Sequence, residues 1–323
     1  MIESVHNEGF EVVVCGLATV DIVTRPVPLS EPIGRANLVI ADRIELTTGG
    51  LVSNSGIALS RLGIHTAAVA CVGKDVWADV IRRQYQSAGL ATTHLIEHPT
   101  ASTSATIVLV DNGGERSFVF DTGATRYLDL AALRSRSRLF ARSRWMLYGY
   151  YSLFPESDRD LPAILSEIRA SGCQTALDTA GSGGTLDPLQ HILPHVDLYL
   201  PNFKEAAQQT GQGDPRAILS TFRALGAPGI LGLKMGEQGA LLSPRTDEYL
   251  QIACLPAPGP VVDTTGAGDA FNAGLLAGLL RGYSLEAAGK LAAAMGAHCV
   301  TGLGATAGLR DWYSTCQLAE LDP

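Results

Sequence analysis

Short apolar runs alternate with amphipathic stretches along this chain, and the two kinds of stretch have the lengths of strands and helices. Residues 11–16 read Glu-Val-Val-Val-Cys-Gly and predict a buried first strand. Further apolar runs predict strands at 66–72, 144–147, 175–177, 198–200 and 230–234. Helical spacing predicts helices at 52–62, 75–87, 158–170, 202–210 and 215–225. This alternation is typical of an α/β fold with three layers, in which helices cover both faces of a mostly parallel central sheet.

Two segments interrupt this alternation, at about 22–48 and 100–124. The first contains three prolines, and the second contains Asn112-Gly113, a strong signal for the turn of a β-hairpin. We expect residues 1–323 to form one domain in which both segments are insertions that build a small antiparallel β lid over a site. Two ordinary surface hairpins would give the same pattern.

The most informative stretch is 263–271, which reads Asp-Thr-Thr-Gly-Ala-Gly-Asp-Ala-Phe. Gly266, Ala267 and Gly268 let backbone N–H groups approach an anion closely, and a helix that begins there adds partial positive charge. Asp269 can accept a proton from a hydroxyl at the same place. Because it lies near a helix N-terminus, we expect it to stay ionised, which makes it a modest base. The alternative is an acid that only stabilises the first helical turn, by about 0.3–1 kcal/mol.

Small residues recur after Asp269 at the spacing of one helix face. They are Ala270, Ala273, Gly274, Ala277 and Gly278. Such a thin face predicts that this helix lies close to the sheet and that its N-terminus is held firmly, as a preorganised anion site requires.

A second glycine-rich stretch begins at Gly49 and Gly50 and continues into a predicted helix that ends at Gly63. Paired glycines bring backbone close to a ligand, and Asn54 offers both a donor and an acceptor to hydroxyl groups. Asp21 follows the first strand, at the end where ligands of open α/β sheets gather. A tight turn with a helix cap, and a loop-capping acid, would explain these residues without a ligand.

Together these motifs resemble those of the ribokinase-like (PfkB) carbohydrate kinase family. Gly49–Gly63 resembles the family's N-terminal motif and Asp263–Gly278 its C-terminal motif. Between them, Pro-Asn-Phe-Lys-Glu at 201–205 resembles an Asn-x-x-Glu element, and 233–240 resembles the nucleotide-side strand and turn. The matches occur in order over nearly the whole chain, and their joint occurrence is highly specific.

The resemblance implies that ATP donates its γ-phosphoryl group to a hydroxyl of a sugar-like molecule, with Mg²⁺ as a cofactor. It implies that Asp269 is the base and that the N–H groups of Gly266–Gly268 form the anion hole. The residues implied at the sugar, beneath the lid, are Asp21, Gly49, Gly50 and Asn54. Those implied at the nucleotide are Lys234, Gly236 and Gly239, with Asn202 and Glu205 organising Mg²⁺ partly through water. A helix cap at Asn202 and a first-turn acid at Glu205 are the structural alternative.

A monovalent cation such as K⁺ near the anion hole is a further implication of the resemblance. Asp263 and Thr265 would supply part of its ligands, with carbonyl groups around 300–304. A buried Asp263 that caps turns is the alternative. Lid strands of some members of the family pair across a homodimer, and the exposed edge at 44–47 is a candidate for such pairing.

Some positions depart from the family's patterns, and they leave the sugar undetermined. Leu51 stands where ribokinases tend to have lysine, and the segment after Asp178 lacks the arginine of many fructokinases and keto-acid sugar kinases. We therefore predict a sugar kinase, with a nucleoside kinase of the same family as the close alternative. A non-catalytic sugar-binding protein would be expected to lose Asp269 or its flanking glycines. A nicotinamide-dependent oxidoreductase would need G-x-G-x-x-G after the first strand, where this chain has none.

Net charge, apolar runs and cysteine spacing limit the binding partners and the cellular location that we expect for this protein. The formal net charge of −8 argues against nucleic acid or an anionic membrane as a general partner. An acidic residue close to the N-terminus without a long apolar run argues against a secretory signal, and no apolar stretch is long enough to span a membrane. The six cysteines form no close pair, which favours reduced thiols and a cytoplasmic protein.

Overall fold

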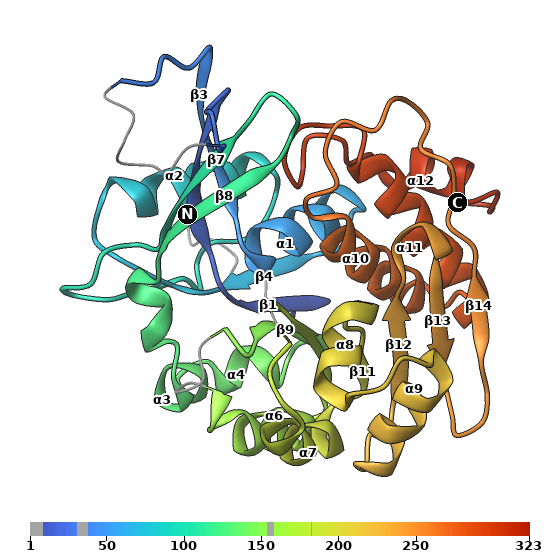
Figure 1. The fold of residues 1–323 in the computed structure, drawn as a ribbon. Coiled ribbons are helices and arrows are strands. Elements are labelled where there is room, and N and C mark those ends of the chain that lie inside the picture. The colour runs from blue at the N-terminus through green and yellow to red at the C-terminus, as the bar shows by residue number, and fades with distance from the viewer. Residues whose placement is uncertain (1–8, 31–37, 154–157, 182) are drawn as a thin grey trace, which may run out of the picture.

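The structure is a computed structural model that describes residues 9–30, 38–153, 158–181 and 183–323. Its main sheet has eight strands: β1 (Val12–Gly16), β4 (Thr66–Val69), β9 (Trp145–Tyr151), β10 (Gln174–Thr179), β11 (Leu198–Tyr199), β12 (Ile230–Lys234), β13 (Ala240–Ser243) and β14 (Leu250–Ile252). They follow the order β14-β13-β12-β11-β10-β9-β1-β4 (Figure 1). Neighbours from β4 to β12 are parallel, and only β13 and β14 are antiparallel additions at one edge. The expected mostly parallel sheet is thus confirmed.

Helices cover both faces of this sheet, as the pattern predicts. One layer contains α1 (Leu51–Arg61), α2 (Val76–Ser87), α10 (Ala267–Leu280) and α11 (Leu285–Cys299), with α12 (Trp312–Leu318) on α11. The other contains α3 (Leu130–Arg134), α4 (Ser137–Phe140), α6 (Leu161–Ala170), α7 (Leu186–Ile192), α8 (Phe203–Thr210) and α9 (Pro215–Ala224). Successive side chains of β1 alternate between the two cores, because a strand points neighbouring residues to opposite faces. A continuous apolar run is therefore what a strand buried on both sides requires.

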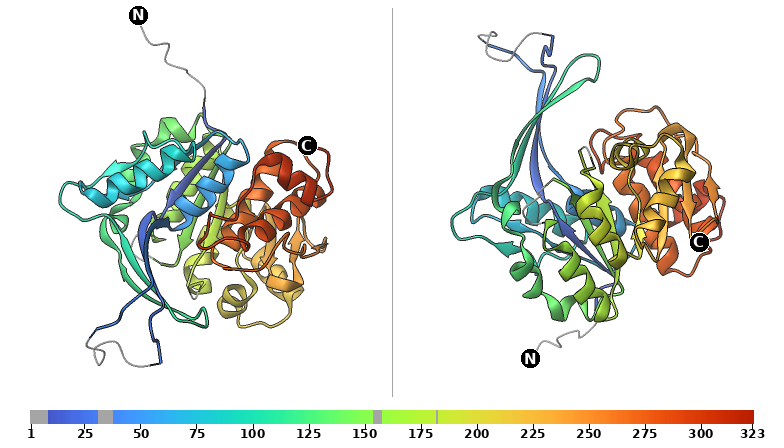
Figure 2. Two further views of the ribbon diagram at one scale, coloured as in Figure 1. Left: turned by 90° about the horizontal axis from the view of Figure 1, so that it is seen from above. Right: turned by 60° about the horizontal axis from the view of Figure 1, so that its bottom comes forward.

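The two inserted segments meet in a second, four-stranded sheet that projects from the body (Figure 2). Its strands are β2 (Thr19–Arg25), β3 (Arg43–Gly49), β7 (Ala105–Val110) and β8 (Arg116–Asp121), in the order β3-β2-β7-β8. Each hairpin is antiparallel, as predicted, but the central pair β2–β7 is parallel. The central strands β2 and β7 both run away from the body, and the outer strands β3 and β8 both run back toward it. Because the two hairpins meet through β2 and β7, the strands at this junction are parallel. We call these four strands the lid sheet.

Minor elements complete the described chain. A two-stranded parallel ladder joins β5 (Cys71–Val72) to β6 (Ile96–Glu97). Short 3₁₀ turns occur at η1 (Gly123–Tyr127), η2 (Leu193–His195) and η3 (Gly236–Gln238).

Several predicted boundaries agree closely with the structure. β12 has the predicted bounds, and Asp75 caps α2 by accepting a bond from the Ala78 N–H at 3.0 Å. The predicted strand at 66–72 is two strands, β4 and β5, and the predicted helix at 158–170 begins only at Leu161. The N-terminal residues behind the signal-peptide expectation, and 31–37 within the first insertion, lie outside the described residues.

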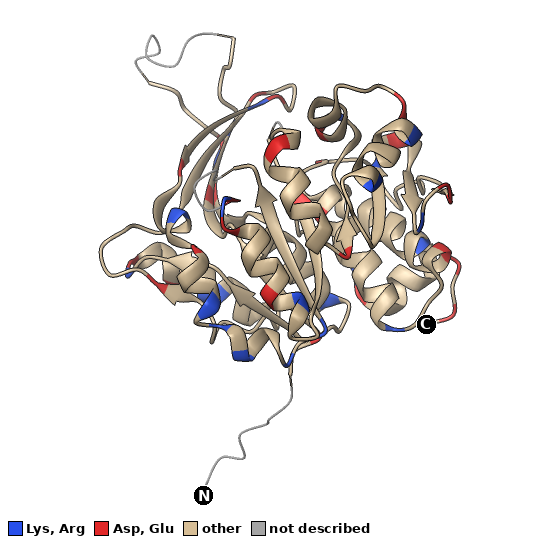
Figure 3. Cartoon of the chain, turned by 90° about the horizontal axis from the view of Figure 1, so that it is seen from below, with Lys and Arg blue, Asp and Glu red and all other residues tan. Residues whose placement is uncertain are grey.

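Acidic and basic residues both occur on many of the helices, strands and loops seen from below (Figure 3). Among the described residues, no helix is both long enough and apolar enough to cross a membrane.

Candidate active site

The N-terminus of α10 presents backbone N–H groups that are weakly paired or unpaired. Gly266 adopts a left-handed conformation with φ 78°, and a Cβ atom there would lie 2.4 Å from the Cβ of Ala305. Only glycine therefore fits this turn. Ala267 N–H makes a long bond of 3.3 Å to the Thr264 carbonyl, and no residue of the described chain offers an acceptor to the Gly268 N–H. Unpaired N–H groups at a helix start are suited to an anion.

The small-residue face of α10 packs on α11, and the prediction that it faces the sheet is wrong. Cβ atoms added at Gly274 and Gly278 would lie 2.7 Å from the Cα atoms of Ala292 and Ala288. The closest approach is therefore between two helix backbones of the same layer. The close packing of α10 on α11 still holds the N-terminus of α10 firmly, as the sequence predicts.

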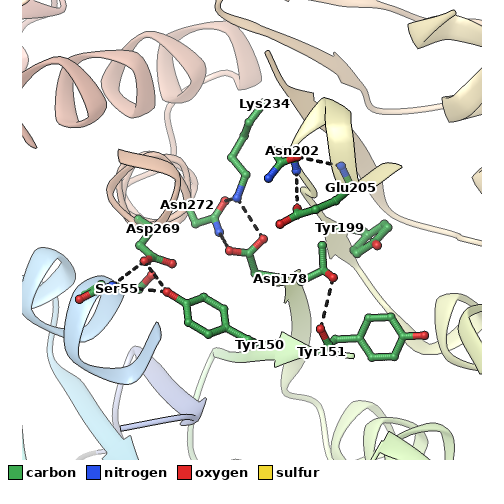
Figure 4. A network of polar contacts seen from close by, with 12 residues as sticks. Ser55, Tyr150, Tyr151, Asp178, Tyr199, Asn202, Glu205, Lys234, Asp269 and Asn272 are labelled. Carbon is green, nitrogen blue, oxygen red and sulfur yellow. Dashed lines mark hydrogen bonds and ion pairs between the residues drawn. The ribbon is translucent and has the colours of Figure 1, made fainter. Parts of the chain in front are cut away.

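Asp269 is buried in the first turn of α10 and held by two donors (Figure 4). Its Oδ2 accepts from the Asn54 amide at 2.7 Å and from the Tyr150 hydroxyl at 2.8 Å. Burial, followed by the nearby charge of Asp178, raises the pKa of Asp269 to about 6, although the Asn54 hydrogen bond opposes this. The expected ionised state therefore holds at neutral pH, and the carboxylate is a stronger base than its position at a helix N-terminus alone suggests.

Sequence reasoning missed a buried network that lies beside Asp269. Asp178, at the end of β10, accepts from Lys234 Nζ at 3.0 Å and from the Asn272 amide at 2.8 Å. Lys234 Nζ also lies 3.4 Å from Asn272 Oδ1 and 3.4 Å from the position of a Cβ atom on Gly268. The predicted position of Lys234 at the nucleotide phosphates is thus compatible with the structure, since its ammonium group lies against the glycine turn. The one-turn spacing of Asn272 after Asp269 was a usable signal, and so was the place of Asp178 directly after a predicted strand, whereas Tyr150 gave none.

Asn202 and Glu205 form a reciprocal cap at the start of α8. The Asn202 side chain accepts from the Glu205 N–H at 2.8 Å, and the Glu205 carboxylate accepts from the Asn202 N–H at 2.9 Å. The alternative stated for these residues, a helix cap at Asn202 and a first-turn acid at Glu205, is therefore present in the structure. Burial and the charge of Asp178 raise the pKa of Glu205 to about 7. The charge of Lys234 and the hydrogen bond from Asn202 oppose this rise only in part, and a carboxylate with raised proton affinity beside a second one is a chemically suitable oxygen ligand for a divalent cation.

The sugar-binding candidates lie together where the lid sheet meets α1. Asp21 lies within β2, a strand of the lid sheet, whereas the sequence predicted it just after the first strand, at the end of the main sheet. A Cβ atom on Gly49 would lie 2.1 Å from Asp21 Oδ2, and Gly50, with φ 81°, caps α1 directly before the turn that carries Asn54. Within the described chain, Asp21 Oδ1, Asn54 Oδ1 and the Thr48 hydroxyl are buried without hydrogen-bond partners. Such groups need polar partners, which a polyhydroxyl ligand can offer.

Gly236 and Gly239 belong to the turn between β12 and β13. Gly239, with φ 79°, is required because a Cβ atom would lie 2.0 Å from the Ile252 carbonyl oxygen. Gly236 has φ 59° and open space around its Cβ position. The turn is therefore open at Gly236, beyond the end of β12 that carries Lys234.

Asp263 and Thr265 are bound to an arginine of the lid sheet. Arg116, the first residue of β8, places Nη2 2.5 Å from Asp263 Oδ1 and donates to the Thr265 hydroxyl. Asp263 also accepts from the N–H groups of Thr265 at 2.7 Å and Gly304 at 2.8 Å. Burial alone would raise the pKa of Asp263, but these hydrogen bonds outweigh it and keep the pKa below its usual range. The turn-capping alternative for Asp263 is therefore present in the structure.

Comparison with known proteins agrees with this geometry. Residues 10–312 match the family described as pfkB family carbohydrate kinase. An "Uncharacterized sugar kinase" of Archaeoglobus fulgidus is 30% identical over 258 residues, covering 78% of this chain and 98% of the relative. A ribokinase of Haemophilus influenzae is 26% identical over 282 residues, covering 85% of this chain and 88% of the relative.

The fold also matches a solved structure of Arabidopsis thaliana ribokinase complexed with ribose and ATP. The TM-score is 0.85 with 22% sequence identity, and the match covers 97% of this chain and 100% of the other. The strand order, the helices on both faces and the projecting second sheet are therefore those of the ribokinase fold. The chain belongs to the pfkB family of carbohydrate kinases, which are phosphotransferases that act on an alcohol group.

Proposed function

We propose that this protein is an ATP-dependent sugar kinase that transfers the γ-phosphoryl group to a hydroxyl of a small carbohydrate. The observation that carries the proposal is the buried Asp269 carboxylate, which lies directly beside the long-bonded Ala267 N–H and the unpaired Gly268 N–H at the start of α10. A base and an anion site are thereby adjacent, as transfer between a hydroxyl and a phosphate requires.

In this proposal, Asp269 takes the proton of the acceptor hydroxyl as the new O–P bond forms and the bond to the ADP oxygen breaks. Asn54 and Tyr150 hold Oδ2, so Oδ1 is the oxygen available to the hydroxyl. The N–H groups of Gly266–Gly268 and the ammonium group of Lys234 stabilise the negative charge on the transferring group. ATP supplies the phosphoryl group, and Mg²⁺, organised by Asn202 and Glu205, would offset its charge.

The acceptor site we propose is the corner with unpaired polar atoms on Asp21, Thr48 and Asn54. A carboxylate accepts hydrogen bonds from two hydroxyl groups, which favours a polyol over a flat base. Asn54 contacts this corner and Asp269 at once, so it can align a bound sugar with the base. We further propose that the lid sheet covers the sugar and excludes water, which limits hydrolysis of ATP.

The experiment that tests the function is ADP release with Mg²⁺ across pentoses, hexoses, sugar acids and ribonucleosides. We expect a sugar to give the highest kcat/KM. A nucleoside as the best acceptor would support the alternative kinase. No release with any acceptor, from protein that melts cooperatively, would favour a non-catalytic binding protein.

We also propose that the lid sheet pairs two copies of the chain. Leu46, Ile22, Ile107 and Val119 occupy one row across all four strands, and Leu46, Ile107 and Val119 are exposed. The neighbouring row contains Asp21 and therefore faces the opposite way, toward the site. An apolar row on the outer face is self-complementary across a two-fold axis, so a second copy is its natural partner.

Sedimentation of the wild type is accordingly expected to show a dimer, and Leu46→Glu should dissociate it by placing a charge in the apolar row. Val76→Glu is the matched control, because Val76 is also an exposed apolar residue but lies on α2, outside the lid sheet. A monomeric wild type, or the same loss of dimer in both variants, would contradict this pairing.

A further inference from the structure

Arg116 joins the lid sheet to the segment that leads into α10. It lies at the start of β8, at the end of the hairpin away from the body, yet its guanidinium group reaches both Asp263 and Thr265. The Asp263 side chain is 4% exposed, whereas that of Arg116 is 24% exposed. The contact is thus an ion pair whose acidic member is buried.

A buried carboxylate is stable only with a compensating positive charge or several donors. Asp263 has two backbone donors, from Thr265 and Gly304, and Arg116 is the cation that the structure places on it. This carboxylate lies three residues before Gly266, so its position affects the turn that forms the proposed anion hole.

Several of the acceptors that the family resemblance assigns to a monovalent cation, and the neighbouring Ala305 carbonyl, already have donors within the described chain. The Val300 carbonyl accepts from the N–H groups of Val262 at 2.8 Å and Asp263 at 3.2 Å. The Cys299 thiol lies 3.4 Å from the Thr265 carbonyl oxygen and 3.2 Å from that of Ala305. Both Asp263 oxygens have protein donors as well. A K⁺ ion on Asp263 would have to displace the Arg116 guanidinium group first and then compete with some of these bonds, so the site with Arg116 in place does not fit the ion.

We propose that Arg116 supplies, from the lid sheet, the positive charge that a monovalent cation would otherwise supply beside the anion hole. This inference rests on the proposed kinase function and makes Arg116 a positioning residue, which acts on the transfer site through Asp263. It also makes closure of the lid sheet over the sugar a requirement for a fully formed anion hole, because only then is the guanidinium group on Asp263.

The test is a K⁺ titration at constant ionic strength, with tetramethylammonium as the replacement ion. The kcat of the wild type should change by no more than about twofold. Without K⁺, Arg116→Ala should lose about tenfold or more in kcat, as expected for a charged hydrogen bond, and K⁺ should restore part of it. Arg116→Lys should retain most of the activity. Arg43→Ala is the matched control, since Arg43 is a lid arginine that pairs with Glu45 of its own strand rather than with Asp263, and it should behave as the wild type.

A second measurement does not depend on turnover. K⁺ should raise the Tm of ligand-free Arg116→Ala above its value in tetramethylammonium and leave the Tm of the wild type unchanged. Equal K⁺ activation of the wild type and Arg116→Ala would overturn the proposal. So would a raised KM for ATP in Arg116→Ala without a K⁺ response, which would make Arg116 a phosphate ligand. If the wild type phosphorylates no acceptor, the kinase proposal fails, while the Tm comparison still decides whether Arg116 replaces the cation.

Discussion

Asp269→Asn is expected to lower kcat by about 100-fold to 10,000-fold, the usual contribution of a positioned general base. Asparagine has nearly the same shape, and its amide oxygen can still accept from Asn54 and Tyr150 at the position of Oδ2. The variant should therefore fold, and the KM values for ATP and the sugar should change little. Steady-state kinetics together with a thermal melt separate loss of the base from loss of structure.

The pH profile provides the control for this variant. The pKa of Asp269 is raised to about 6, so the carboxyl group is protonated below that pH and cannot accept a proton. Wild-type kcat should fall as pH decreases through this region, while the residual rate of Asp269→Asn should lack that step. If kcat of the variant remains within about tenfold of the wild type, or about 1.4 kcal/mol of barrier, Asp269 is not the base.

Gly266→Ala is expected to lower kcat by about 100-fold to 1,000-fold, as loss of an anion-hole donor does. An added Cβ atom would lie 2.4 Å from the Cβ and 2.7 Å from the Cα of Ala305, so the turn must move away from its present position. The N–H groups of Gly266–Gly268 would move with it. The measurements are kcat with the best acceptor, and the free energy of unfolding.

Gly282→Ala is the matched control for this substitution. Gly282 follows the other end of α10 with φ 81°, and no atom lies within 4 Å of its Cβ position. Both variants force alanine into a left-handed conformation, at a cost of about 1–2 kcal/mol, but only Gly266→Ala also creates a collision. Equal kcat values for the two variants would mean that the turn at Gly266 has no part in the transfer.

Local interactions explain why much of the fold could be predicted. β12 and the cap of α2 at Asp75 depend on residues that are neighbours in the sequence, so their pattern is visible there. The parallel pairing of β2 with β7 was not predictable from either hairpin, because it depends on the direction in which both leave the body. The small-residue face of α10 correctly predicted a close contact, but the contact is with α11 and not with the sheet. The spacing of small residues shows that something packs closely there, and it does not show which element does.

In the candidate site, too, features that depend on sequence neighbours were predictable, and features that depend on distant residues were not. Sequence by itself determined the turn and helix start at 263–271, because a helix N-terminus, its glycines and its acid are contiguous and their chemistry is local. Tertiary structure alone decided the proton affinity of Asp269, which depends on burial and on Asp178, and the partner of Asp263, which is Arg116 of the lid sheet. Electrostatic environment and ion pairing are set by distance in space, and folding brings those distant charges together.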